Sequence, residues 1–223
     1  LKDIPMSERF SSMAFVLTAP IMEALHKHSF SLGLTRGVLP PEPFLYFVQQ
    51  DSLYRLDCAR ALALVGAKMR REENLLFLLE LARQTIASGQ ELCRLYFKQY
   101  RVGPAEAKGP ACLAAGAHLI ERATTGSAAE GLAALLAHFW MRQEAGERMR
   151  KRAVTAGPYA KWIESHSGKE VEALADKATV LADRLADDAG EVERDRMFES
   201  FVAASRLEFC FWDEASRLAS WPA

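Results

Sequence analysis

The sequence lacks a dominant charge, a long apolar run and the alternating β-branched segments that are typical of strands. Its 28 Lys and Arg residues balance 29 Asp and Glu residues, so the chain has no overall field to attract nucleic acid or an anionic membrane. No apolar stretch approaches the roughly 18 residues of a membrane span, and the N-terminus lacks a charged segment followed by an apolar one. We therefore expect no nucleic-acid or membrane partner and a cytoplasmic location.

Cysteine is sparse, and its positions form no CxxC pair and no metal-finger spacing. The four cysteines, which fall in apolar helical segments, are Cys58, Cys93, Cys112 and Cys210. We interpret them as reduced, buried thiols, and we predict neither a metal site nor a cofactor. His118 and Glu121 are three residues apart and could share a metal, but no second helix supplies a matching pair.

Helical periodicity is present along most of the 223 residues, half of which are apolar. This pattern predicts an all-α fold, a single compact multi-helix bundle in one domain that spans residues 1–223. Proline, glycine and serine signals divide the chain into segments joined by short connections, which favour antiparallel neighbours. The expected helices run from Ser7 toward His28, from Pro40 or Pro41 toward Met69, and over about 75–100, 110–123, 127–153, 158–163, 167–186 and 191–219.

Two carboxylates, Asp51 and Glu208, fall on apolar faces of these helices. Burying an unpaired carboxylate costs roughly several kcal/mol, so each must be paired, neutralised or used in chemistry. We expect burial to raise the pKa of Glu208 toward neutrality, as a proton carrier requires; the alternative is a structural Glu paired with an Arg or a backbone group. The two stripes are Phe47, Asp51, Tyr54, Cys58, Leu62 and Val65, and Phe198, Phe201, Ser205, Glu208, Trp212 and Ala215.

Short motifs also follow one another in a fixed order from about residue 20 to residue 216. They are His28-Ser-Phe30, Gly37-Val-Leu39, Phe44 through Gln50-Asp51, Tyr54, Leu135-Leu136 through Trp140, Gly146, Tyr159 through Trp162-Ile163, and Glu208 through Phe211-Trp212-Asp213. Together they resemble the TenA family, also called thiaminase II, which has a haem-oxygenase-like fold of about seven helices. The resemblance implies a central pocket that binds and hydrolyses an aminopyrimidine in thiamin breakdown or salvage, in a homodimer or homotetramer.

The resemblance also implies roles for individual residues. In family members of the cysteine-bearing type, an Asp holds the amino-pyrimidine and tyrosines stack on the ring or orient it. A Cys attacks the carbon that bears the leaving group, and a Glu moves protons. Asp51, Tyr54 and Glu208 stand at the matching Asp, Tyr and Glu positions. Phe47 and Trp212, which belong to the same motifs, complete the expected contacts to the substrate ring.

The chain departs from the family at the remaining pocket positions. Where the family reads Leu-Leu-Pro-Cys-x-Trp-x-Tyr, this chain has His138 in place of the cysteine and Arg142 in place of the tyrosine. Two further family tyrosines correspond to Ala115 and His166. An imidazole can activate a water molecule, so we expect His138 to act with the two carboxylates in catalysis. We expect Arg142 and His166 to bind the substrate.

Arg142 leaves two alternatives open. A guanidinium stays charged at any working pH and needs an anion when it is buried. Either the substrate carries a carboxylate or phosphate that Arg142 holds, or Arg142 forms an internal salt bridge with Glu208 or Asp51.

The function is accordingly expected to be hydrolysis of an aminopyrimidine with an altered substrate. One alternative is a ligand-binding or regulatory homologue without catalysis. Another is a protein similar to pyrroloquinoline-quinone synthase, a branch of the same fold, that acts on an anionic N-heterocycle.

Overall fold

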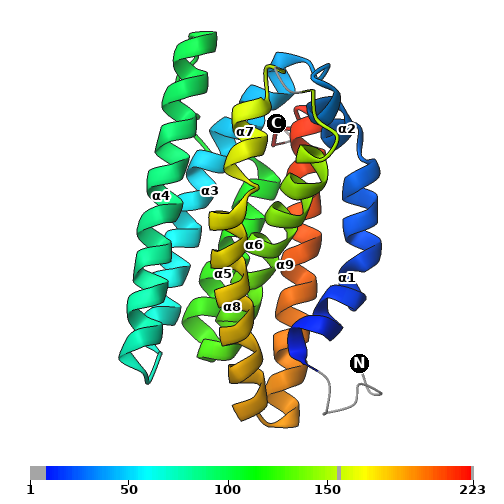
Figure 1. Cartoon of the computed structure of the whole chain (residues 1–223). Coiled ribbons are helices and arrows are strands. Elements are labelled where there is room, and N and C mark those ends of the chain that lie inside the picture. The colour runs from blue at the N-terminus through cyan, green and yellow to red at the C-terminus, as the bar shows by residue number, and fades with distance from the viewer. Residues whose placement is uncertain (1–8, 155–156, 222–223) are drawn as a thin grey trace.

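The computed structural model describes residues 9–154 and 157–221, and it forms an elongated bundle of helices (Figure 1). The described residues contain no strand, so the predicted all-α class is confirmed. None of the described helices is both long and apolar enough to cross a bilayer. The helices are α1 (Phe10–Lys27), α2 (Ser29–Arg36), α3 (Pro41–Ala67), α4 (Glu72–Tyr100), α5 (Pro110–Thr125), α6 (Ala128–Arg150), α7 (Ala160–Ser165), α8 (Lys169–Asp188) and α9 (Glu191–Arg217).

Local sequence signals explain several helix boundaries. Pro41 and Pro110 occupy the first positions of α3 and α5, where a missing N–H costs no helical hydrogen bond. The side chain of Ser127 accepts a hydrogen bond from the backbone of Glu130 and caps α6. Gly37 ends α2 with φ 69°, a left-handed conformation that glycine adopts without strain. The predicted cap Ser7 lies outside the described residues.

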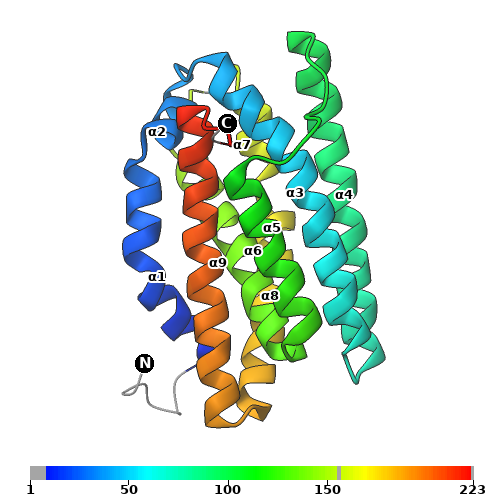
Figure 2. The same cartoon turned by 180° about the vertical axis from the view of Figure 1, so that it is seen from behind.

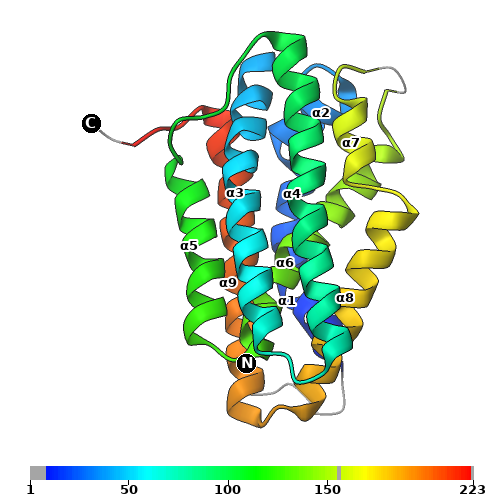
Figure 3. The ribbon, with the colours of Figure 1, turned by 90° about the vertical axis from the view of Figure 1, so that its left-hand side faces the viewer.

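Three long helices, α3, α6 and α9, contact one another and form the centre of the bundle. Helices α4 and α5 pack against α3, α8 packs against α6, and α1 packs against α9, as the views from behind and from the side show (Figures 2 and 3). Every residue from 129 to 138 of α6 is buried, which requires neighbours on all sides of that helix. The side chains of α3, α6 and α9 that face one another are therefore shielded from water.

The cysteines are less uniformly buried than the sequence predicts. Cys58 and Cys112 are buried and Cys93 is half-buried, but Cys210 is exposed. Cys210 follows the buried Glu208 by two residues on α9, and such a step turns a side chain to the opposite side of a helix. The expectation of four buried thiols is thus wrong for Cys210.

The suggested metal pair also has other partners. His118 Nε2 lies 3.2 Å from the backbone oxygen of Ser200, and Glu121 pairs with Arg122. Within the described residues, no group of three His, Cys, Asp or Glu side chains is placed to hold a metal ion.

Candidate active site

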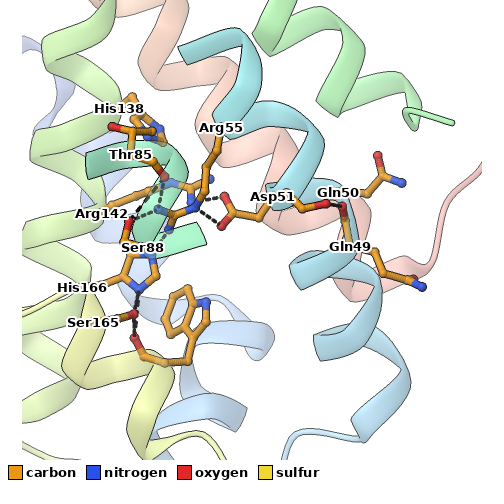
Figure 4. A network of polar contacts seen from close by, with 12 residues as sticks. Gln49, Gln50, Asp51, Arg55, Thr85, Ser88, His138, Arg142, Ser165 and His166 are labelled. Atoms are coloured by element: carbon orange, nitrogen blue, oxygen red, sulfur yellow. Dashed lines mark hydrogen bonds and ion pairs between the residues drawn. The ribbon is translucent and has the colours of Figure 1, made fainter. Parts of the chain in front are cut away.

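Asp51 lies in the interior of the bundle, where α3 faces α6, and both of its carboxylate oxygens are engaged. Oδ1 accepts a hydrogen bond from Nη1 of Arg142, and Oδ2 accepts one from Nε of Arg55 at 2.6 Å. Figure 4 shows the two arginines meeting at this carboxylate. Burial alone would raise the pKa of Asp51, but Arg142 and Arg55 outweigh it and hold the pKa well below its usual value. Asp51 is therefore an ionised, doubly paired acid.

Arg55 is held in place from three sides, because its other nitrogens reach α4 and the residue that follows α7. Nη1 lies 3.1 Å from the hydroxyl of Ser88, and Nη2 lies 3.1 Å from Nε2 of His166. Gly89 makes room for this side chain, since a Cβ atom at position 89 would lie 2.5 Å from Cδ of Arg55. The contact between Arg55 and Asp51 is thus fixed by the packing of α3 on α4.

Glu208 of α9 meets the same centre from the other side. Its Oε1 lies 2.5 Å from Nδ1 of His138, and its Oε2 accepts a hydrogen bond from Nε of Arg142 at 3.4 Å. Burial alone would raise the pKa of Glu208, but Arg142 and His138 lower it below its usual value. The expected rise toward neutrality is wrong, because the sequence does not show that an arginine from α6 reaches this carboxylate. Glu208 is ionised near neutral pH.

His138 is buried and uncharged near neutral pH, since burial and then Arg142 lower its pKa, although Glu208 opposes them. The hydrogen on Nδ1 therefore points at the Glu208 carboxylate. With the hydrogen on Nδ1, the other ring nitrogen, Nε2, carries the lone pair that can accept a proton. This arrangement, a carboxylate that orients a neutral imidazole, is a common form of general base.

Aromatic rings enclose the guanidinium that joins the two acids. The central carbon of Arg142 lies 5.5 Å from the ring centroids of Phe47 and Tyr54, and 5.6 Å from that of Phe211. These distances are within the range of cation–π attraction. Trp212 packs against Phe47 with ring centroids 5.2 Å apart, so it supports the ring that faces the guanidinium.

His166 lies behind Arg55 as seen from Asp51. Its ring stacks on Trp162 with centroids 4.1 Å apart, and its Nδ1 lies 2.8 Å from the backbone oxygen of Trp162. Because Arg55 donates to Nε2, the ring must carry its hydrogen on Nδ1. Burial, together with Arg55 and Arg142, lowers the pKa of His166 to about 3, so this histidine is neutral throughout the physiological range.

The structure thus brings together seven of the eight residues that the sequence nominates, and it places the eighth, Trp212, directly behind Phe47. Sequence reasoning missed Arg55, and it placed Phe211 in a family motif beside Glu208 without nominating it as a site residue. Arg55 could have been found, because it follows Asp51 by four residues, the spacing of an ion pair along a helix. The nominated set is Asp51, Glu208, His138, Tyr54, Phe47, Arg142, His166 and Trp212.

A family model confirms the resemblance noted in the sequence. The TENA/THI-4/PQQC model matches residues 18–218. The chain belongs to this family. Among curated TENA/THI-4/PQQC relatives, it is 29% identical over 218 residues to the aminopyrimidine aminohydrolase of Halalkalibacterium halodurans, covering 95% of this chain and 97% of the relative. It is 28% identical to the aminopyrimidine aminohydrolase of Bacillus subtilis, covering 96% of this chain and 92% of that one.

Solved structures of TenA homologues share the fold. A homologue from Pyrococcus horikoshii superimposes with a TM-score of 0.83 at 25% identity, covering 95% of this chain and all of the other. One from Pyrococcus furiosus gives a TM-score of 0.87 at 23% identity, covering 92% and 99% of the two chains. The described helices are therefore arranged as in these two TenA homologues.

Proposed function

We propose that this TENA/THI-4/PQQC member is a hydrolase that cleaves an exocyclic C–N bond of an amino-substituted, pyrimidine-like heterocycle. The observation that carries the proposal is that Arg142 joins Asp51 of α3 and Glu208 of α9 in one buried centre, where the neutral imidazole of His138 is hydrogen-bonded to Glu208. Two curated relatives that align over nearly their whole length are named aminopyrimidine aminohydrolase, and their names support the substrate class.

In this proposal, His138 replaces the missing cysteine by activating water. Nε2 takes a proton from the water molecule as the water oxygen bonds to the carbon that bears the amino group. The C–N bond breaks, its electron pair leaves with nitrogen, and the nitrogen takes the proton back from Nε2. An amine and water thus yield an alcohol and ammonia. Glu208 keeps Nδ1 protonated and stabilises the imidazolium that forms during the step.

The remaining residues bind the substrate or hold a substrate-binding residue in position. Asp51 accepts hydrogen bonds from the amino group of the heterocycle, and Tyr54 and Phe47 supply ring faces for stacking. Arg55 holds the Asp51 carboxylate and His166 holds Arg55, so both act through Asp51. Cys58, one helical turn beyond Tyr54, is not a substitute nucleophile: burial raises its pKa well above the usual value, so it stays a thiol.

A second candidate function is ligand binding without turnover. It is favoured by the ion pairs that Arg142 forms with both carboxylates, because a centre whose acids are already paired is stable without a substrate. An activity measurement separates the two candidates.

The test measures ammonia release from 4-amino-5-aminomethyl-2-methylpyrimidine, with thiamin assayed for release of its pyrimidine half. The wild-type protein should turn over at least one amine, and Glu208→Gln should lower kcat about 100-fold or more with a smaller change in KM. Because the Glu208 carboxylate raises the pKa of His138, this variant should also move the acidic limb of the kcat profile to lower pH. Glu199→Gln, an exposed site on the same helix, is the matched control. Absence of turnover with every amine tested would favour the binding protein.

A further inference from the structure

The guanidinium of Arg142 occupies the position that a flat ligand would need. It lies between the carboxylates of Asp51 and Glu208, with the rings of Phe47, Tyr54 and Phe211 around it. All five surrounding side chains are buried. The site therefore accommodates a planar group that carries N–H donors and lies among aromatic rings. In this structure, that group is the guanidinium of Arg142.

One nitrogen of this guanidinium is left without a partner. Nη1 donates to Asp51 and Nε donates to Glu208, but Nη2 is buried and has no hydrogen-bond partner among the described residues. A buried N–H of a charged group without an acceptor is unfavourable. The unpaired donor marks a place where an acceptor is missing.

A ligand that donates to Asp51 must take the place of Arg142 there. The other carboxylate oxygen is held by Arg55, which Ser88 and His166 fix in turn. Oδ1, which accepts from Arg142, is therefore the exchangeable side of the carboxylate.

If a ligand displaced Arg142 from Asp51, Arg142 would lose one of its two carboxylate partners. It would keep only the longer contact to Glu208, at 3.4 Å, while its charge stayed buried. Four charges now balance, since Asp51 and Glu208 are opposed by Arg55 and Arg142 with both histidines neutral. A neutral ligand on Asp51 keeps this balance but leaves both Nη1 and Nη2 of Arg142 buried without an acceptor, whereas an oxyanion on the ligand supplies an acceptor to each.

We infer that the substrate carries both an amino group and an oxyanion, and that Arg142 exchanges its bond to Asp51 for one to that oxyanion. The inference rests on the proposed function and deepens it, because it makes Arg142 the residue that selects an anionic amino-heterocycle over a neutral one. A carboxylate and a phosphate share the required chemistry, since either presents two oxygens to a guanidinium.

The test compares ligands that differ only in charge. Isothermal titration of the full chain would use 4-aminopyrimidine-5-carboxylate beside its carboxamide, and 4-amino-5-hydroxymethyl-2-methylpyrimidine beside its phosphate ester. The wild-type protein should bind the anionic member of at least one pair about tenfold more tightly or better, and the two pairs distinguish carboxylate from phosphate. Arg142→Gln should reduce the preference to within about twofold. Arg148→Gln, on the same helix and paired instead with His26 and Glu23, should retain it.

Equal affinities within both pairs, or no binding of any of the four by the wild-type protein, would overturn the inference. So would an anion preference that survives Arg142→Gln. If that variant does not fold, the comparison in the wild-type protein decides alone. Turnover of a neutral amine with equal affinities would leave the hydrolase standing and remove the role of Arg142. A clear anion preference without turnover would leave the role of Arg142 standing and remove the hydrolase.

Discussion

The burial of His166 beside Arg55 predicts a specific loss of stability in acid. His166 is buried with its pKa lowered from 6.5 to about 3, so the unfolded chain binds a proton at mildly acidic pH that the folded chain does not. The contribution of this histidine to stability is fully present above pH 6.5, and it is lost as the pH falls below 6.5 toward 3.

The size of the effect follows from the two pKa values. At pH 5 the unfolded state gains RT ln(1 + 10^1.5), about 2 kcal/mol, and at pH 7 it gains only about 0.2 kcal/mol. The folded state gains almost nothing at either pH. His166→Gln removes the titrating group and keeps an oxygen that accepts from Arg55. Between pH 7 and pH 5 the wild-type protein should therefore lose about 2 kcal/mol more of its free energy of unfolding than the variant does.

Urea unfolding of both proteins, followed by circular dichroism at pH 7, 6 and 5, measures this difference. The buried histidines that the two proteins share cancel in the comparison. Unfolding free energies that run parallel over this range would refute the reasoning, because they would mean that His166 takes up a proton in the folded state. An NMR titration of the His166 ring nitrogens would show the same result directly.

Two further predictions concern glycines beside the centre. Gly146→Ala places a Cβ atom 2.1 Å from the backbone oxygen of His166, and a backbone atom cannot move aside as a side chain can. Urea unfolding should therefore show that the free energy of unfolding falls by about 1–3 kcal/mol or more. The control Gly103→Ala, which has open space around it, should change the free energy of unfolding by less than about 0.5 kcal/mol. Gly89→Ala should push Arg55 away from Asp51 and reduce ligand affinity in calorimetry as well as stability; unchanged affinity would show that Arg55 does not set the position of Asp51.

The fold and the inward-facing residues could be predicted from the sequence because they depend on local periodicity. The spacing that places Asp51 with Phe47 and Tyr54 on one helix face needs no knowledge of the other helices. Helix boundaries could be predicted where a cap or a proline marks them, as at Ser127. α2 was missed because its eight residues offer barely two turns of periodicity. α4 begins at Glu72, before the expected start near residue 75, because acidic side chains in a first turn favour the helix dipole.

The electrostatic state of the centre could not be predicted in the same way. Whether the pKa of Glu208 rises or falls depends on what α6 brings within reach of it, and a pattern along α9 carries no such information. The sequence left Arg142 with two alternatives for the same reason. The internal ion pairs are present, and the unpaired Nη2 keeps the other alternative open to experiment.

The close approach of Gly89 to Arg55 has a consequence for how this protein can diverge. The side chain of Arg55 fills the space that a side chain at position 89 would need. A larger residue at position 89 therefore fits only if the residue at position 55 becomes shorter. Asp51 would then lose the counter-ion that Arg55 supplies. Among descendants of this chain, we expect positions 55 and 89 to change together or not at all.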